Sequence, residues 1–301
     1  MHLAITGATG FVGQRLLRLA VAAGHSINAL ARSPQPDMAG VTWVFGDLMA
    51  SAIPDALCDN TDVVIHVGGV INPRHSADFL NANVGGTERV VQAAVQAGVR
   101  RFIHVSSLAA REPDLSRYGA SKAASEVLFP NADLDWSIVR PPAVYGPGDR
   151  ETLELFRMAK QGVSLVPRQG SASYIHVDDL CAALLTLALG TAGVGQTFEP
   201  DDGHPGGYTH SQFARLIGSA IGRDQIVVPI PDIGLRIAAA LNTAAAAFAR
   251  TSPKLSFDRA SYFAHPDWVS RGLAIPGWSP KISAEPGLAA TAQWYREAGW
   301  L

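Results

Sequence analysis

The sequence contains few cysteines, little net charge and no segment of low complexity. Its two cysteines, Cys58 and Cys181, have no CxxC spacing, which excludes a disulfide framework and is typical of reduced thiols in a cytoplasm. A formal net charge of −2 excludes recruitment to nucleic acid or to an anionic membrane by bulk charge. With 301 residues, 48% of them hydrophobic, the chain can nevertheless bury a large core.

The chain also lacks an apolar run long enough to cross a membrane. Its most apolar stretch, residues 233–248, is shorter than the ~20 residues that a span needs and contains Arg236 and Asn242. We expect a buried or partly exposed helix over 233–249, with a role at a membrane surface as the alternative. The N-terminus has no basic region followed by a long apolar one, so export is not expected and the predicted location is cytoplasmic.

Short apolar runs alternate with helical patterns through the first half of the chain. We predict helices over residues 11–23, 81–97 and 118–129. Apolar strands separated by helices are typical of a parallel sheet covered on both faces. The predicted fold is therefore α/β, a doubly wound parallel sheet of the Rossmann type. The runs that we predict as its strands are HLAIT, SINALAR, VTWVFG, DVVIHVGG, RFIHVSS and WSIVRPP.

The pattern changes after Pro147. Residues 150–173 are polar and predicted helical, YIHVDDLCAALLTLAL resumes a strand and an apolar helix, and QTFEP fits one more strand. DDGHPGGYTHS, from Asp201, is predicted to be a loop before a mostly helical remainder. We expect ligands at the carboxyl ends of the strands, beneath a cap. The expected dinucleotide-binding domain comprises residues 1–149 and 174–200, and a smaller, mostly helical substrate-binding cap comprises residues 150–173 and 201–301.

A glycine-rich segment, ITGATGFVG, directly follows the first predicted strand and opens the first helix. Gly7, Gly10 and Gly13 let the backbone approach a pyrophosphate, which the N-terminus of the helix also attracts. A dinucleotide cofactor is therefore predicted. Where an acidic residue would bind the adenosine ribose of NAD, the chain has Arg32, whose guanidinium suits a 2′-phosphate. NADP is favoured, although an Arg32 that stacks on adenine would accept NAD as well.

Tyr118 and Lys122 lie four residues apart in RYGASKAAS, so a helix places both on one face. A pair of surface side chains is the plain interpretation. The functional interpretation is catalysis, because a cation ~4–6 Å from a phenol favours the phenolate and lowers its pKa by roughly 1–3 units. An unperturbed phenol, with a pKa near ~10, exchanges protons poorly at pH 7.

With this pair and the glycine turn, the chain resembles the extended short-chain dehydrogenase/reductase family, also called the NAD-dependent epimerase/dehydratase family. The resemblance covers most of the chain and implies that Tyr118 is the general acid/base and that Lys122 contacts the nicotinamide ribose. It also implies that Ser107 bonds the substrate oxygen, with Ser106 as the alternative. The further motifs that carry it, in order, are GDL at 46–48, HVGG at 66–69, NVGGT at 83–87, HVSS at 104–107, RPPAVYGPGD at 140–149 and YIHVDD at 174–179.

No metal site is expected. The resemblance also implies a cofactor site and makes a homodimer possible through the helices 81–97 and 118–129, which form the dimer bundle in many relatives. His66, His104 and His176 lie in strands without ligand spacing, and we expect them to be structural. The residues expected to bind the cofactor are Gly7, Thr9, Gly10, Phe11, Val12, Gly13, Arg32, Asp47, Leu48, Val67, Gly68, Gly69, Asn83, Tyr118, Lys122, Pro141 and Val144.

Departures from the family pattern narrow the substrate. Members that act on sugar nucleotides commonly have an arginine two residues before the YIHV strand; here Ala172 stands there, with Arg168 upstream as the available substitute. Leu108 and Ala109 replace the acidic pair of the dehydratases, which argues against dehydration. The cap segments IPDIGLRIAAAL, HPDWVSRGL and QWYREAGWL resemble the branch that contains hydroxysteroid dehydrogenases and ketone reductases.

We therefore expect an NAD(P)-dependent oxidoreductase that interconverts a ketone and a secondary alcohol on a largely apolar small molecule. The cofactor carries the hydride and Tyr118 the proton. Two alternatives stay open: a sugar-nucleotide epimerase that removes and returns the hydride, and a non-catalytic nucleotide-binding module. The apolar surface of the cap either receives the substrate or packs on the domain below.

Overall fold

The computed structural model describes residues 1–73, 75–234, 237, 240 and 257–301. Its chain forms two compact units, each with its own sheets and helices. The first unit contains residues 1–141, 180–200 and 272–279, and the second contains residues 142–179, 201–271 and 280–301.

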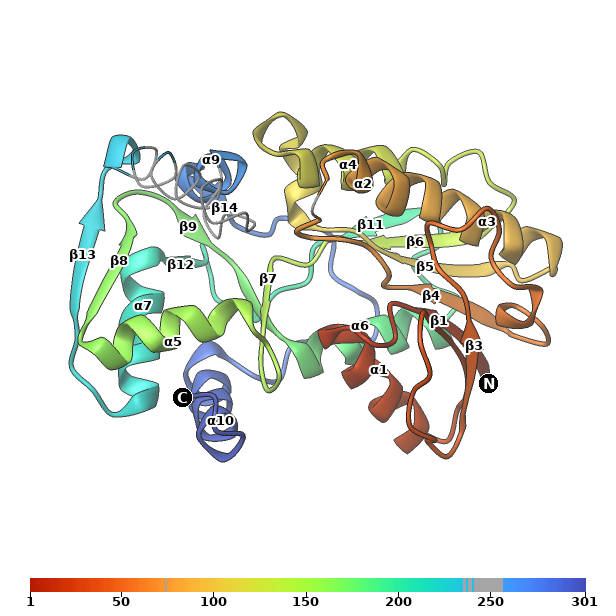
Figure 1. Ribbon diagram of the computed structural model, residues 1–301, viewed down its shortest axis with the longest axis horizontal. Coiled ribbons are helices and arrows are strands. Elements are labelled where there is room, and N and C mark those ends of the chain that lie inside the picture. The colour runs from red at the N-terminus through yellow and green to blue at the C-terminus, as the bar shows by residue number, and fades with distance from the viewer. Residues whose placement is uncertain (74, 235–236, 238–239, 241–256) are drawn as a thin grey trace. The chain divides into compact units, whose positions relative to one another are not determined.

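A seven-stranded parallel sheet forms the centre of the first unit (Figure 1). The strand order is β11-β6-β5-β4-β1-β2-β3. From β1 the chain adds β2 and β3 on one side and then β4, β5, β6 and β11 on the other. The switch point between β1 and β4 is where doubly wound sheets bind their ligands. The predicted Rossmann-type sheet is thus confirmed, with every neighbouring pair parallel. The strands are β1 (His2–Thr6), β2 (Ser26–Ala31), β3 (Val41–Phe45), β4 (Val63–His66), β5 (Arg101–Val105), β6 (Asp135–Val139) and β11 (Gln196–Phe198).

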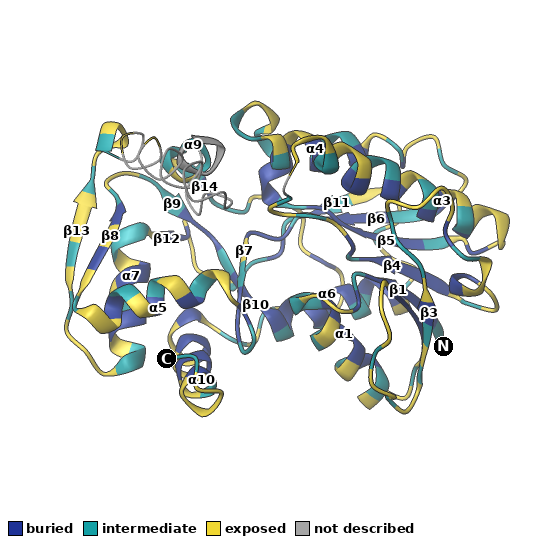
Figure 2. Ribbon diagram, in the orientation of Figure 1, coloured by how far each residue is buried: buried dark blue, intermediate teal, exposed yellow. Residues whose placement is uncertain are grey.

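Helices cover both faces of this sheet, and its central strands are buried (Figures 1 and 2). α1 (Phe11–Ala22) and α6 (Val177–Leu189) lie on one face, and α3 (Gly86–Gln96) and α4 (Arg117–Glu126) lie on the other. Burial of both strand faces removes apolar surface from water, which explains strand sequences that are apolar without alternation. Fully buried strand residues include Leu3, Ile5, Val64 and Ile103.

The helix predicted over residues 81–97 is divided into three parts. α2 (Ala77–Leu80) continues into a π-helical turn, η2 (Asn81–Gly85), and then into α3. Two consecutive glycines, Gly85 and Gly86, weaken the α-helical preference at the junction. The wider turn places Asn83 in the interior of the unit, where it is 1% exposed. Short 3₁₀ turns are η1 (Asp55–Leu57), η3 (Leu108–Arg111) and η4 (Pro113–Leu115).

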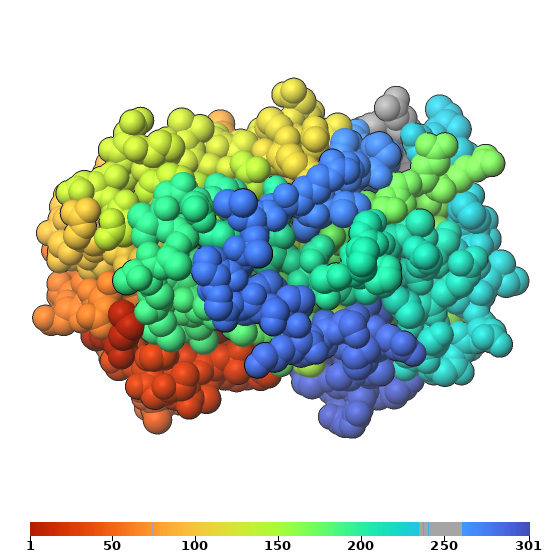
Figure 3. All heavy atoms as spheres, turned by 180° about the vertical axis from the view of Figure 1, so that it is seen from behind, coloured from red at the N-terminus to blue at the C-terminus, as the bar shows by residue number. Residues whose placement is uncertain are grey.

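The segment 272–279 returns late in the sequence to complete the first unit. Leu273 bridges Phe198 of β11, and the Gly272 backbone lies so close to Glu199 that a Cβ there would stand 2.5 Å from its nitrogen. In Figure 3 this segment, in blue, runs over the surface beside the green residues of α6 and β11. The expected assignment of residues 201–301 to the cap therefore differs from the observed unit at these positions.

The second unit contains four short sheet pairings and a helical core. α5 (Glu151–Gln161), α7 (His210–Ile221) and α10 (Ala284–Glu297) pack around an apolar cluster that includes Phe156, Phe213 and Tyr295. β7 (Ala143–Tyr145) pairs with β10 (Tyr174–His176), and β8 (Val163–Pro167) pairs with β13 (Ile226–Ile230). β9 (Ser171–Ala172) lies between β12 (Tyr208–Thr209) and β14 (Asp267–Trp268), and α9 spans Phe257–Ala264.

This unit differs from the expected cap in content and boundaries. Residues 150–173 contain β8 and β9 besides a helix, and the predicted loop DDGHPGGYTHS contains β12. Residues 142–149 and 174–179, expected in the dinucleotide-binding domain, lie here because β7 and β10 pair with each other. The helix predicted over 233–249 falls mostly outside the described residues. Within the described part of the chain, no helix is long and apolar enough to cross a membrane.

Candidate active site

The glycine turn fits closely between the ends of β1 and β4. Gly7 has a φ of +70°, and a Cβ there would lie 2.7 Å from the nitrogen of Gly68. A Cβ at Gly13 would lie 2.0 Å from the carbonyl oxygen of Gly7. No side chain caps the N-terminus of α1, which follows Gly10. An all-glycine cradle at an uncapped helix N-terminus fits the pyrophosphate of a dinucleotide.

A buried chain of hydrogen bonds runs beneath this turn. The Gly68 N–H donates to the Thr6 hydroxyl (3.1 Å), which lies 2.6 Å from Nδ1 of His66. On the other side of the ring, Nε2 lies 2.9 Å from the Thr87 hydroxyl, which donates to the carbonyl of Asn83 (2.6 Å). Because Thr87 uses its proton toward Asn83, it accepts from Nε2–H, and Nδ1 accepts from Thr6. The chain therefore fixes His66 as the neutral Nε2–H tautomer.

Two stacked histidines lie in this interior, both neutral. The rings of His66 and His104 are 5.5 Å apart, and the Nε2 of His104 lies 3.0 Å from the Ser125 hydroxyl. Burial, reinforced by the charge of Lys122, lowers the pKa of His66 to about 3. The same causes, burial first, lower the pKa of His104 well below its ordinary value. Among the described residues, no group of three or more His, Cys, Asp or Glu is arranged to hold a metal ion.

Lys122 is held on α4 with its ammonium group inside the unit. The residue is 4% exposed, and its Nζ donates to the carbonyl of Val105 at the end of β5 (2.8 Å). Burial lowers the pKa of Lys122 to about 8, and the negative charge of Glu126 opposes that change. A lysine in this state retains its charge near neutral pH and loses it at moderately alkaline pH.

Tyr118 lies one turn before Lys122 on α4, half-buried, beside Ser107. The Ser107 hydroxyl bonds the phenol and lowers its pKa, but burial is the larger effect, so the pKa of Tyr118 is raised. The lowering that the sequence analysis attributed to Lys122 is absent, because the Nζ of Lys122 is directed to Val105. The structure therefore brings Ser107 and Tyr118 together directly, with Lys122 on the same helix.

Ser106, the alternative to Ser107, belongs to a separate buried network. It is 4% exposed, and its hydroxyl donates to the carboxylate of Glu126. Arg140 binds the same carboxylate through Nε (2.9 Å) and a terminal nitrogen (2.6 Å). Beyond it, Glu199 lies 3.7 Å from Arg140 and 3.6 Å from Arg111. Since Ser106 is engaged below, the geometry supports Ser107 as the hydroxyl available at the strand end.

Sequence reasoning did not identify Glu126 and Arg140 as supports of the site. The signal was present in part: Glu126 lies four residues after Lys122 on the same helix, and Arg140 opens the motif RPPAVYGPGD. Their pairing across 14 residues could not be read from either position alone.

Asn83, expected to bind the cofactor, makes its amide bonds within the protein. Its Oδ1 accepts from the Val70 N–H (2.7 Å), and its Nδ2 donates to the Val70 carbonyl (3.0 Å) and to Ser121 (2.9 Å). Ser121 in turn donates to the carbonyl of Tyr118 (2.8 Å). Asn83 thus ties the chain after β4 to the helix that carries Tyr118, and a direct contact with the cofactor remains a prediction.

The remaining predicted cofactor residues of the first unit lie at strand ends. Arg32 is exposed directly after β2. The Asp47 carboxylate accepts from the Met49 N–H (3.0 Å), and the Leu48 carbonyl accepts from the guanidinium of Arg89 (3.1 Å). Further predicted positions follow β1, β4 and β6, namely Thr9, Phe11, Val12, Val67, Gly69 and Pro141.

Val144 lies in β7 of the second unit. The ends of β1 through β6 thus supply every other predicted position, directly or through the helices that follow them. What this arrangement can do is bind a dinucleotide over the glycine turn and move a proton at a serine–tyrosine pair.

Comparison with known proteins finds similar families, sequences and structures. The model of the NAD dependent epimerase/dehydratase family matches residues 3–198. The ceramide reductase of Caulobacter vibrioides is 37% identical, over 99% of this chain and 95% of that protein. The 2-alkyl-3-oxoalkanoate reductase of Stenotrophomonas maltophilia is 29% identical, over 96% and 97%. The solved structure of MoeE5 in complex with UDP-glucuronic acid and NAD has a TM-score of 0.75 at 22% identity, covering 99% of both chains, and shows likeness of fold.

Proposed function

The chain belongs to the NAD-dependent epimerase/dehydratase family, and from that premise we propose that it reduces a ketone to a secondary alcohol on a long-chain, lipid-like molecule. It is an NAD-dependent enzyme of the short-chain dehydrogenase type, a family whose members similar to this chain are oxidoreductases and epimerases. One observation carries the proposal: 37% identity to a ceramide reductase over almost the whole chain. The Ser107–Tyr118 contact supplies the groups that such a reduction needs.

The proposed chemistry uses the strand-end serine and the helix tyrosine together. When bound, the reduced nicotinamide supplies a hydride to the carbonyl carbon. Charge that develops on the carbonyl oxygen is met by the hydroxyls of Ser107 and Tyr118, and the phenol proton passes to that oxygen. The carbonyl π bond breaks, one C–H and one O–H bond form, and solvent returns the proton to Tyr118. The Lys122 ammonium, held by the Val105 carbonyl at the end of β5, would contact the nicotinamide ribose when the cofactor is bound, as the resemblance to the family implies.

Turnover of a panel of ketones tests the proposal. Oxidation of NADPH or NADH should accompany reduction of long-chain 3-keto lipids, and each turnover should yield one secondary alcohol by mass spectrometry. Absence of turnover for every ketone of the panel with either nucleotide, while both nucleotides bind, would contradict the proposed reduction.

We propose NADPH as the preferred reductant because Arg32 stands where a carboxylate would favour NADH. Arg32 is exposed, so a 2′-phosphate can reach its guanidinium without displacing a buried group. Arg32→Asp should invert the ratio of kcat/KM for NADPH to that for NADH by about 10-fold or more, since a charged bond is replaced by repulsion. The matched control is Arg18→Asp, an exposed arginine on α1, which should leave the ratio unchanged.

A sugar-nucleotide epimerase is the second candidate, favoured by the likeness of fold to MoeE5, a protein solved with UDP-glucuronic acid. Against it, Ala172 is a buried residue of β9, with no cationic side chain for a diphosphate. Titration calorimetry of UDP and dTDP into protein saturated with NADP⁺ separates the two. Micromolar binding would favour the epimerase through Arg168 or another cation; no heat would favour the reductase.

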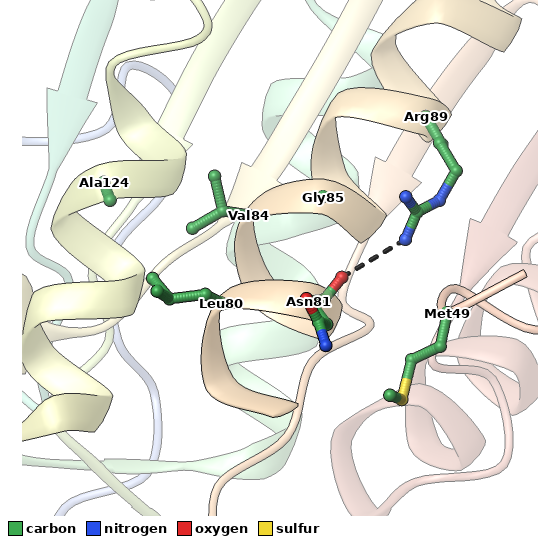
Figure 4. Close-up of a pocket in the computed structure, with 7 residues that line it drawn as sticks. All are labelled: Met49, Leu80, Asn81, Val84, Gly85, Arg89 and Ala124. Carbon is green, nitrogen blue, oxygen red and sulfur yellow. Dashed lines mark hydrogen bonds between the residues drawn. The ribbon is translucent and has the colours of Figure 1, made fainter. Parts of the chain in front are cut away.

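We also propose that the enzyme forms a homodimer through the outer surface of α2, η2, α3 and α4. Leu80 (57%), Val95 (42%) and Val127 (70%) are exposed on these elements or directly after them. An open cavity of about 600 Å³ lies on the same side of the unit, and Figure 4 shows the residues around it. It is lined by Met49, Leu80, Asn81, Val84, Gly85, Arg89 and Ala124. Sedimentation velocity tests the assembly by comparing the oligomeric state of wild type with that of Leu80→Gln/Val127→Gln. The cytoplasmic location stays a prediction.

A further inference from the structure

Among the described residues of the second unit, one strand pair has an exposed apolar face. β8 and β13 pair in parallel, with Val163 beside Ile226 and Leu165 beside Val228. These paired residues share one face of the two-stranded sheet, and they are 41%, 67%, 51% and 39% exposed. We call this four-residue surface the β8–β13 face. Figure 2 shows β13 mostly in the colour of exposed residues.

The opposite face of the same strand pair is buried against helices. Ser164 (3%) and Val166 (6%) are buried, and α5 and α7 contact the strands from that side. Parallel strands normally have both faces covered, because their residues are apolar on both sides. A parallel pair that exposes four aliphatic side chains in two adjacent rows therefore indicates that something else covers the outer face.

The chemistry of the β8–β13 face favours a lipid surface over a protein. All four side chains are aliphatic, whereas protein interfaces are rich in aromatic residues and involve about 20–30 residues on each side. Exposed arginines stand at both ends of the pair: Arg223 lies against Gly162, just before β8, and Arg168 directly follows β8. Aliphatic groups between guanidinium groups match the layering of acyl chains and phosphates at a bilayer surface.

Acidic residues are also present at the two ends, where Asp224 precedes β13 and Asp232 follows it. The charged residues around the β8–β13 face therefore have both signs. In the proposed contact the aliphatic side chains supply the attraction, and the arginines orient the face toward phosphate groups. The face is too small for strong binding by itself, which suits a reversible contact.

We propose that the β8–β13 face docks the enzyme reversibly on the surface of a phospholipid bilayer, from which the substrate is drawn. The choice of a lipid rests on the proposed function, because a long-chain ketone partitions into bilayers and is concentrated at their surface. The exposed face itself is independent of that function. Docking and turnover can therefore be measured separately.

Flotation of the full-length protein with extruded vesicles of phosphatidylcholine and phosphatidylglycerol tests the docking. Leu165→Gln/Ile226→Gln should lower the vesicle-bound to free ratio by about tenfold or more, because two exposed aliphatic side chains lose their transfer energy. The matched control is Leu189→Gln/Val194→Gln, two residues of the first unit that are each 43% exposed. The control should float like wild type. Equal flotation of both variants, or no flotation of wild type, would overturn the proposal.

Two further measurements keep the outcomes distinct. If the double variant does not fold, Arg168→Gln/Arg223→Gln should weaken flotation on anionic vesicles and leave flotation on phosphatidylcholine alone less affected; no change would count against docking. Conversion of a wild-type dimer to a monomer by Leu165→Gln/Ile226→Gln in sedimentation would assign the face to a second copy and overturn the proposal. Turnover of a short, soluble ketone without flotation rejects docking alone, and flotation without turnover of any ketone rejects the proposed function alone.

Discussion

The half-exposed end of the site and the buried layer beneath it use side chains in opposite ways. Tyr118 is half-buried and has the Ser107 hydroxyl as its polar side-chain contact, which leaves the phenol able to take a second partner. The buried layer contains the Thr6–His66–Thr87 chain and the Ser106–Glu126–Arg140 network. Within each of them, the polar side chains satisfy one another's hydrogen bonds. Unsatisfied groups can do chemistry, whereas satisfied groups hold positions.

The two buried systems differ from each other in charge. The chain through His66 is neutral throughout, with each proton direction fixed by its neighbours. The network through Glu126 is ionic and includes Arg140 and Glu199. Substitutions at the half-exposed end should therefore change rate more than stability. Substitutions in the buried layer should change stability more than rate, with a pH dependence where a histidine is removed.

Tyr118→Phe should give the largest effect. Loss of the proton donor should lower kcat by about 10²–10⁴-fold, the range for general acid catalysis. The free energy of unfolding should change by no more than about 1 kcal/mol, since one hydrogen bond of a half-buried hydroxyl is lost. Stopped-flow reduction of a ketone measures the first quantity and urea unfolding the second. Binding of NADPH serves as the control and should be unchanged; full turnover by this variant would sink the proposed mechanism.

Arg140→Leu should have the reverse profile. It leaves the buried carboxylate of Glu126 without its bidentate partner, and breaking such a pair costs about 3–5 kcal/mol of folding stability. We expect a loss near the lower end of that range, because the Arg140 side chain is 23% exposed and solvent weakens the interaction. Urea unfolding checks the loss, and kcat at low temperature should fall by less than about tenfold. In the double variant Glu126→Leu/Arg140→Leu much of the stability should return. A single variant as stable as wild type would show that the pair is not supporting this layer.

The sheet was predictable because its signals are local and redundant. Six predicted apolar runs correspond to β1 through β6, and QTFEP corresponds to β11. The sequence analysis assigned Gly7 and Gly13 to a phosphate-binding turn. The structure explains why these positions are glycine, since a Cβ at either would collide with neighbouring backbone atoms. Such positions depend on backbone geometry within a few residues, which a sequence displays directly.

The second unit was less predictable because its strands are short and pair over long distances. Val163–Pro167 and Ile226–Ile230 are partners 63 residues apart, and neither run shows a partner in its own neighbourhood. The expected lowering of the Tyr118 pKa failed for a similar reason. Spacing placed Lys122 on the correct helix, but a backbone carbonyl 17 residues away receives its Nζ proton, and burial determines the direction of the shift.

His66→Gln should give the smallest effect at neutral pH and a diagnostic one in acid. The pKa of His66 is about 3 in the folded protein, against 6.5 for an unperturbed imidazole, so the folded state binds fewer protons than the unfolded state between these values. The stability that depends on neutral His66 is complete above pH 6.5 and is lost as the pH falls toward 3. Within that window its slope approaches about 1.4 kcal/mol per pH unit.

Removing the imidazole should therefore reduce the slope of unfolding free energy against pH by up to that amount. This change in slope is separate from any stability that the variant loses at pH 7. Urea titrations at several pH values from 7 to 4 measure it, and His75→Gln, at an exposed position outside the buried layer, provides the control. Parallel curves for His66→Gln and wild type would mean that the ring is charged when folded. The neutral chain from Gly68 to Asn83 would then be incorrect, because a protonated Nδ1 cannot accept from Thr6.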